Sequence, residues 1–87
     1  MANYKIQIKS SAKKELVKLP KKDLQRVVNK IRSLASNPRL SGCEKLSGEE
    51  KYRVRHGNYR IVYCIEDLQL IVIVVKIGQR KDVYKKR

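Results

Sequence analysis

The sequence predicts a small α+β domain in which a helical hairpin packs on one face of a mostly antiparallel sheet, in the order β-α-α-β-β-β. Three observations predict this fold: one alternating segment at the start, two segments with helical spacing, and three alternating segments at the end. Helices followed by a run of strands are typical of one helical layer on one sheet. The 87 residues suffice for a single domain, which we assign to residues 1–87.

The first half of the chain predicts one strand and two helices. Residues 3–9 alternate between apolar and polar side chains, as in a half-buried strand. Apolar residues then recur three and four positions apart, first at Ala12, Leu16 and Leu19, and later at Leu24, Val27, Val28, Ile31, Leu34 and Ala35. Pro20 separates the two helices, and Asn37-Pro38 ends the second.

The second half predicts a loop over residues 39–50 and then three strands, over about 51–56, 58–65 and 68–77. Gly57-Asn58 fits a type II′ hairpin turn, which has glycine at its first central position. Glu66-Asp67 predicts the next tight turn. The apolar run over residues 70–75 is typical of a strand that is buried on both faces.

Alternation along the hairpin gathers three arginines on one face of the sheet. Arg53 and Arg55 share a face of the first strand, and Arg60 lies on the same face of the second. A turn at Gly57-Asn58 puts Arg55 directly across from Arg60, whereas a turn at His56-Gly57 puts Arg53 there. Neither strand contains an acid that would offset the repulsion. We therefore expect the cluster to bind an anion, since guanidinium groups match phosphate oxygens bidentately.

The net charge of +14, from 22 Lys and Arg against 8 Asp and Glu, indicates a polyanionic partner, with nucleic acid first, an acidic protein second and an anionic membrane third. No apolar stretch reaches the roughly 18 residues of a membrane span, so we expect no segment to cross a membrane. Of the three partner classes we expect nucleic acid and an acidic protein, and no membrane. Two cysteines without ligand spacing predict free thiols in a reducing, cytoplasmic setting. A single histidine excludes catalysis by a histidine pair, and no cluster of metal-ligating residues is visible. We expect neither metal nor cofactor.

Three segments resemble the RelE toxins of bacterial and archaeal toxin–antitoxin pairs, within the wider RelE/ParE superfamily. They are Lys45-Leu46-Ser47-Gly48, the hairpin from Tyr52 to Tyr63, and the ending Gly78-Gln79-Arg80 with Val83-Tyr84. With the order of elements, the resemblance covers nearly the whole chain. It implies a ribosome-dependent endoribonuclease that cuts messenger RNA in the ribosomal A site by attack of the 2′-hydroxyl, and so inhibits translation. It also implies an acidic RelB-like antitoxin as partner.

The same resemblance implies roles for individual residues. Arg60, Arg80 and Tyr84 fall on active-site positions of the family, and we expect Tyr84 to act as the base while the two arginines hold the scissile phosphate. Three further residues are expected to bind RNA phosphates: Arg53, Arg55 and Lys81. The first two stand where RelE toxins have lysines, which keeps the charge but removes a group that can titrate. Six residues of the basic helical face are expected to dock on ribosomal RNA: Lys13, Lys14, Lys18, Lys21, Lys22 and Arg26.

A ParE-like toxin is the alternative that these residues leave open. Such a toxin inhibits DNA gyrase without cutting RNA, and it shares the fold, the basic charge and much of the hairpin. Many ParE-like members carry the Tyr-Arg-Val-Arg pattern seen here at residues 52–55. Many also lack the equivalents of Arg80 and Tyr84, whose presence favours the nuclease. A non-catalytic RNA-binding domain is a third interpretation.

Overall fold

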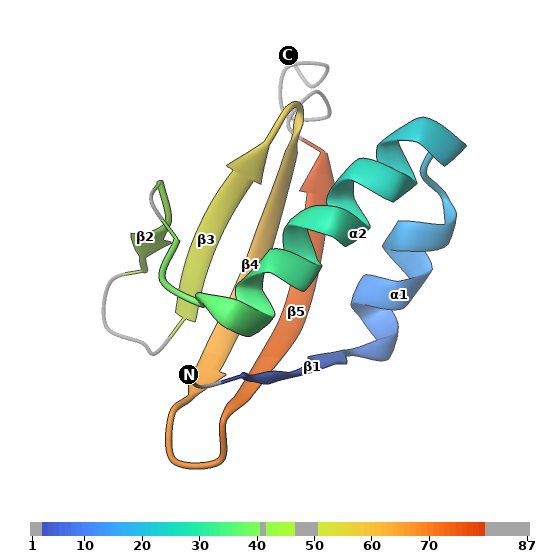
Figure 1. Ribbon diagram of the computed structural model, residues 1–87. Helices are drawn as coiled ribbons and strands as arrows, with labels where there is room; N and C mark the ends of the chain where they lie inside the picture. Colours follow the sequence, from blue (N-terminus) through green and yellow to red (C-terminus); the bar gives the residue numbers. More distant parts are fainter. Residues whose placement is uncertain (1–2, 41, 47–50, 80–87) are drawn as a thin grey trace.

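The computed structural model describes residues 3–40, 42–46 and 51–79, and in that part of the chain two helices cover one face of a five-stranded sheet (Figure 1). The predicted α+β class is confirmed. The strands lie in the order β1-β5-β4-β3-β2. β1 is parallel to β5, and the other neighbouring pairs are antiparallel.

The elements of the first half begin and end close to their predicted positions. β1 spans Lys5–Ile8, α1 spans Ser10–Val17 and α2 spans Lys21–Ser36. Pro20 is the N-cap of α2, where its missing amide hydrogen costs no helical hydrogen bond. Asn37 ends α2 in a non-helical conformation, as expected of a residue that precedes proline.

The second half contains a strand that the sequence pattern does not predict. β2 (Glu44–Lys45) lies within the predicted loop and pairs with β3 (Lys51–His56). β4 spans Tyr59–Glu66 and β5 spans Ile71–Gln79. The predicted tight turn at Glu66-Asp67 is wrong, because Glu66 still pairs with Ile71 and the residues between them form the connection.

The hairpin turn between β3 and β4 is the predicted one. Gly57 has a φ of +63°, and the positive φ is confined to this first turn residue, as a type II′ turn requires. Val54 lies across from Ile61 and Arg55 lies across from Arg60. The alternative register, which would set Arg53 across from Arg60, is wrong.

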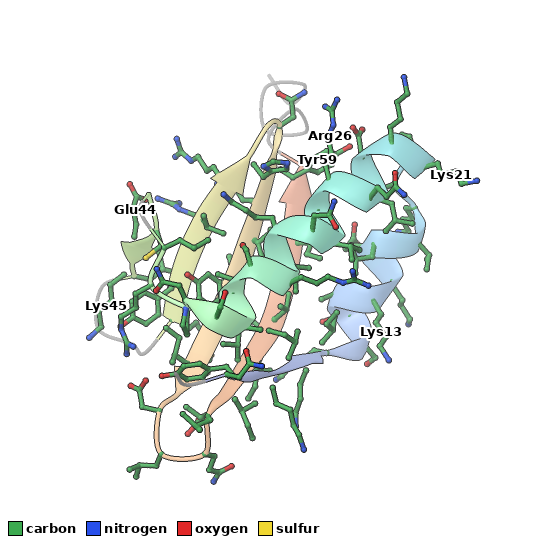
Figure 2. All side chains as sticks on the ribbon, viewed as in Figure 1. Lys13, Lys21, Arg26, Glu44, Lys45 and Tyr59 are labelled. Atoms are coloured by element: carbon green, nitrogen blue, oxygen red, sulfur yellow. The ribbon has the colours of Figure 1, made fainter. Side chains whose placement is uncertain are left out.

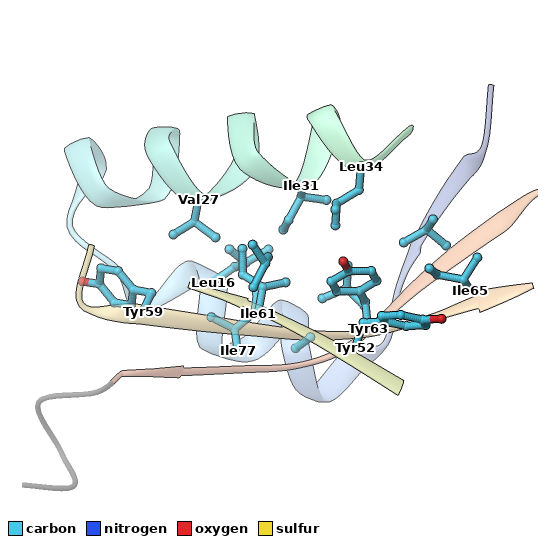
Figure 3. Close-up of a cluster of buried hydrophobic side chains, with 14 residues drawn as sticks. Leu16, Val27, Ile31, Leu34, Tyr52, Tyr59, Ile61, Tyr63, Ile65 and Ile77 are labelled. Atoms are coloured by element: carbon cyan, nitrogen blue, oxygen red, sulfur yellow. The ribbon is translucent and has the colours of Figure 1, made fainter. Parts of the chain in front are cut away.

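The hydrophobic core lies between the helices and the sheet (Figure 3). Val27, Ile31 and Leu34 project from α2 toward alternate residues of the sheet, and Ala12 and Leu16 project from α1. The buried residues of the sheet are Tyr52, Val54, Tyr59, Ile61, Tyr63, Ile65, Val72, Val74 and Ile77. The predicted apolar helix faces are therefore confirmed.

We call the sheet surface that points away from α1 and α2 the open face. Ile71 and Ile73 point to it and are only half-buried, although their neighbours Val72 and Val74 are completely buried. The prediction that residues 70–75 are buried on both faces is wrong, because both helices pack on the same side of the sheet.

A β-bulge reverses the alternation of β5. Tyr63 pairs with Val74, but its neighbour Val62 pairs with Lys76, so Val75 is an extra residue in β5. Val74 faces the helices before the bulge and Ile77 faces them after it. The bulge therefore turns Lys76 to the open face.

A network around Asp67 ties the β4–β5 connection to the segment after α2. Arg39 donates hydrogen bonds of 2.8 and 3.2 Å to the Asp67 carboxylate, and the Tyr4 hydroxyl donates another of 2.8 Å. The Arg39 guanidinium also lies 5.5 Å from the ring centroid of Tyr52, which stacks on Tyr63. The hydrogen bonds from Arg39 and then from Tyr4 hold the pKa of Asp67 below its usual range.

The Asp67→Asn variant is expected to have a lower midpoint of thermal unfolding at pH 7, because an amide cannot accept charge-assisted hydrogen bonds. The folded-state pKa of Asp67 is depressed. The stabilisation is therefore present above the unfolded pKa, about 3.9, and is lost as pH falls through the folded pKa. The midpoints of the two proteins should converge as the pH falls below about 4.

Glu15→Gln is the matched control, since its exposed ion pair with Lys18, at 3.8 Å, is of a kind that contributes little to stability. A constant difference between wild type and Asp67→Asn down to pH 2 would contradict the role of the carboxylate.

Candidate functional site

Three strands of the open face converge on one pocket of about 140 Å³. We call it the open-face pocket, and its lining residues are Leu46, Arg53, Arg60, Val62, Lys76 and Gly78. Two of the three predicted hairpin arginines therefore meet in one concave surface. An anion in this pocket would contact more than one cation.

The pairing of β4 with β5 determines the shape of the open-face pocket. Arg60 lies across from Gly78, and Val62 lies across from Lys76. A Cβ at Gly78 would have no heavy atom within 4 Å, and its backbone conformation does not require glycine. The missing side chain at this position therefore leaves free space directly beside Arg60.

Arg53 forms an ion pair with Glu44, its partner across the β2–β3 ladder. The expectation of an arginine cluster without a counter-charge is wrong at this position, because β2 brings Glu44 next to Arg53. Arg53 first, with a smaller effect of Arg55, holds the pKa of Glu44 below its usual range. The Nε of Arg53 is buried and has no acceptor among the residues that the structure describes.

Arg60 and Arg55 face each other across the hairpin. Arg60 is half-buried in the open-face pocket, whereas Arg55 is exposed. Within residues 3–40, 42–46 and 51–79, no carboxylate forms an ion pair with Arg60. Like charges directly opposite each other destabilise a sheet, so a bound anion would relieve this pair.

Lys76 is a pocket residue that the sequence pattern does not predict. Simple alternation from Val72 and Val74 would put Lys76 beneath the helices. The bulge at Val75 turns its side chain to the open face instead. The sequence carries no signal for this, because residues 70–75 are a continuous apolar run without alternation.

Arg80, Lys81 and Tyr84 are outside the described residues and stay predictions. The six basic residues predicted to bind ribosomal RNA are all exposed. Three of them, Lys13, Lys21 and Arg26, are seen projecting from the helical layer in Figure 2. Because the helices cover the opposite side of the sheet, these cations and the open-face pocket lie on two different faces of the molecule.

Two further observations apply to the described ranges only. No helix there is long and apolar enough to cross a membrane. No group of three or more His, Cys, Asp and Glu side chains there is arranged to hold a metal ion.

Comparison with known proteins gives consistent matches over nearly the whole chain. Residues 6–84 match the family model described as the ParE toxin of the type II toxin–antitoxin system parDE. A RelE-like toxin protein of Escherichia coli is 35% identical over 86 residues, which are 93% of this chain and 90% of that protein.

Solved structures with the same fold include two toxins. The toxin in the toxin–antitoxin complex RelBE2 from Mycobacterium tuberculosis has a TM-score of 0.82 and 29% identity, with 92% of this chain and 94% of that chain covered. The isolated RelE toxin of Escherichia coli has a TM-score of 0.77 and 27% identity, with 95% and 93% covered.

The Glu44→Gln variant is expected to bind single-stranded RNA more tightly, because Arg53 loses its carboxylate partner and becomes available to a phosphate. One additional phosphate contact should steepen the dependence of log K on log salt by about 0.7. Fluorescence anisotropy with a short labelled RNA, at several salt concentrations, measures both quantities.

Glu66→Gln removes the same charge from an exposed position at the far end of β4 and serves as the control. Equal salt slopes for wild type and Glu44→Gln would show that Glu44 does not compete with phosphate for Arg53.

Proposed function

Since this chain belongs to the RelE/ParE family of toxins from type II toxin–antitoxin systems, we propose that it is a ribosome-dependent endoribonuclease that cuts messenger RNA in the A site. The proposed reaction is attack of a 2′-hydroxyl on the adjacent phosphodiester without a metal ion. The observation that carries the proposal is the convergence of Arg53, Arg60 and Lys76 on the open-face pocket.

Arg60 is the residue best suited to hold the scissile phosphate. It is half-buried, where charge interactions are less screened by water, and it has no ion pair within the described residues. Its fork of N–H donors matches two phosphate oxygens at once. The space beside it at Gly78 leaves room for the sugar–phosphate chain. Arg53 would join once a phosphate oxygen replaces the Glu44 carboxylate.

RNA cleavage by its own 2′-hydroxyl needs a base, stabilisation of the phosphorane charge and an acid for the leaving 5′-oxygen. We assign the base to Tyr84 and the charge stabilisation to Arg60 and Arg80, with Arg55 and Lys81 adding positive field. The assignments of Arg80, Lys81 and Tyr84 rest on the family resemblance. Nearby arginines favour the tyrosinate form of a base such as Tyr84.

The arrangement of the two basic surfaces supports a role on the ribosome. The open-face pocket would hold messenger RNA, while the helical cations on the opposite side would bind ribosomal RNA phosphates. The ribosome would then hold the message in line for attack, which compensates for weak acid–base groups. This role implies a cytoplasmic location.

We also propose an acidic RelB-like antitoxin as partner. The Mycobacterium tuberculosis structure named above is a toxin–antitoxin complex, and the net charge of +14 on this chain complements an acidic protein. Such a partner would fold on binding and shield the cationic surfaces.

The description of the matching family model as a ParE toxin favours a second candidate function. In that function the chain would bind and inhibit DNA gyrase and would leave RNA intact. The arginines at positions 53 and 55 are equally compatible with it.

The Arg60→Ala variant is expected to cleave the message about 10²- to 10³-fold more slowly, the usual cost of one group that stabilises transition-state charge. The cleavage rate of Arg60→Lys should lie between those of wild type and Arg60→Ala, because the charge remains but the bidentate fork is lost. Primer extension on ribosomes that hold a defined message measures the rate and the position of the cut.

Lys5→Ala is the control, since Lys5 is an exposed cation of β1 outside both the pocket and the helical face, and its rate should stay within about threefold of wild type. Intact message with folded wild-type protein would contradict the nuclease. Inhibition of gyrase supercoiling by the same preparation would then support the second candidate.

The Tyr84→Phe variant tests whether Tyr84 is the general base of the reaction. Removal of a general base typically costs about 10²- to 10⁴-fold in rate, and the same primer-extension assay measures it. A loss below about tenfold would contradict the assignment.

A further inference from the structure

The leaving 5′-oxygen needs a proton donor that the residues discussed so far do not supply well. Arginine has a pKa above 12 and keeps its protons in proteins. In this chain arginine occupies positions 53 and 55, so neither residue there can titrate. Among the described residues that line the open-face pocket, Lys76 carries the one ammonium group. An ammonium has three rotatable donors and can give up a proton.

The bulge in β5 directs Lys76 to this pocket. Val75 is the extra residue, and without it Lys76 would continue the inward series of Val72 and Val74. A bulge interrupts the ladder of hydrogen bonds, and bulges beside active sites commonly re-aim a side chain. Without the bulge Lys76 would point into the core and Ile77 to the open face, so the bulge is required both for the burial of Ile77 and for the placement of Lys76.

The register brings Lys76 to the neighbourhood of Arg60 without direct pairing. Arg60 lies across from Gly78, and Lys76 is two residues before Gly78, so Arg60 and Lys76 are diagonal neighbours on the same face. Diagonal neighbours lie about 7–8 Å apart at their backbones, within reach of long side chains. One phosphodiester can therefore contact both side chains, at a non-bridging oxygen and at a bridging oxygen.

We propose that Lys76 is the general acid of the cleavage reaction, which rests on the proposed nuclease function. The 2′-oxygen forms a bond to phosphorus as its proton passes to the base. The bond from phosphorus to the 5′-oxygen breaks, and the Lys76 ammonium transfers one proton to that oxygen. The products are a 2′,3′-cyclic phosphate, a 5′-hydroxyl and a neutral amine, which regains its proton from water.

A substrate with sulfur at the bridging 5′ position distinguishes a role of Lys76 as proton donor from a role of its positive charge alone. A thiolate leaves without protonation, so the reaction no longer needs an acid. On the natural message Lys76→Ala is expected to lose about 10²- to 10⁴-fold in the single-turnover rate. On the sulfur-bridged message the loss should fall below about tenfold. Lys76→Arg, which keeps the charge, should remain as slow as Lys76→Ala on the natural message.

Two results would overturn the role of Lys76 alone. Equal losses on the two messages would mean that Lys76 acts by charge or binding, and full activity of Lys76→Arg on the natural message would mean the same. Failure of wild type to cut either message on ribosomes would instead overturn the proposed function, and the acid role with it.

Lys5→Ala is the matched control, because Lys5 is an exposed lysine on β1, the strand beyond β5. Its rates on both messages should equal those of wild type. Lys76 is itself exposed, so its variants should fold, which circular dichroism and the midpoint of thermal unfolding would verify.

Discussion

The alternation of β4 beneath the helices is the constraint on which the rest of the structure depends. Its inward residues Tyr59, Ile61, Tyr63 and Ile65 are all buried, so Arg60 must point to the open face. A slip by one residue would bury Arg60 without a partner and expose the core residues, at a cost of several kcal/mol. β4 pairs with β3 on one side and β5 on the other, so this one strand fixes the position of both neighbours relative to the arginines.

Three further features beside these strands shape the pocket: the short strand β2, the bulge in β5 and Gly78. Next to β3, the short strand β2 carries Glu44 to Arg53, so part of the positive charge is neutralised in the isolated protein. In β5 the bulge carries Lys76 to the open face, and Gly78 leaves space beside Arg60. The regular ladder sets the arginines in place, and these features set which of them are available to a phosphate.

The features that could be predicted from the sequence are those that residues close together in the chain determine. Gly57-Asn58 selects the turn and thereby the register of Arg55 against Arg60, and the spacing of Val27, Ile31 and Leu34 selects the buried side of α2. The missed features depend on pairing between distant segments. Two residues of β2 carry no alternation signal, and the extra residue at Val75 is recognisable only against the ladder with β4. The exposed side of residues 70–75 depends on where both helices pack, which no local pattern encodes.

The central claim is that the open face meets messenger RNA while the helical face meets ribosomal RNA. Electron cryo-microscopy of the protein on ribosomes tests it most directly, with a message that carries a 2′-deoxy nucleotide at the cleavage position so that the cut cannot occur. We expect the message to lie against Arg60, Lys76 and Gly78, with α1 and α2 turned toward ribosomal RNA. A message that runs along the helices, with the open face turned away from it, would contradict the claim.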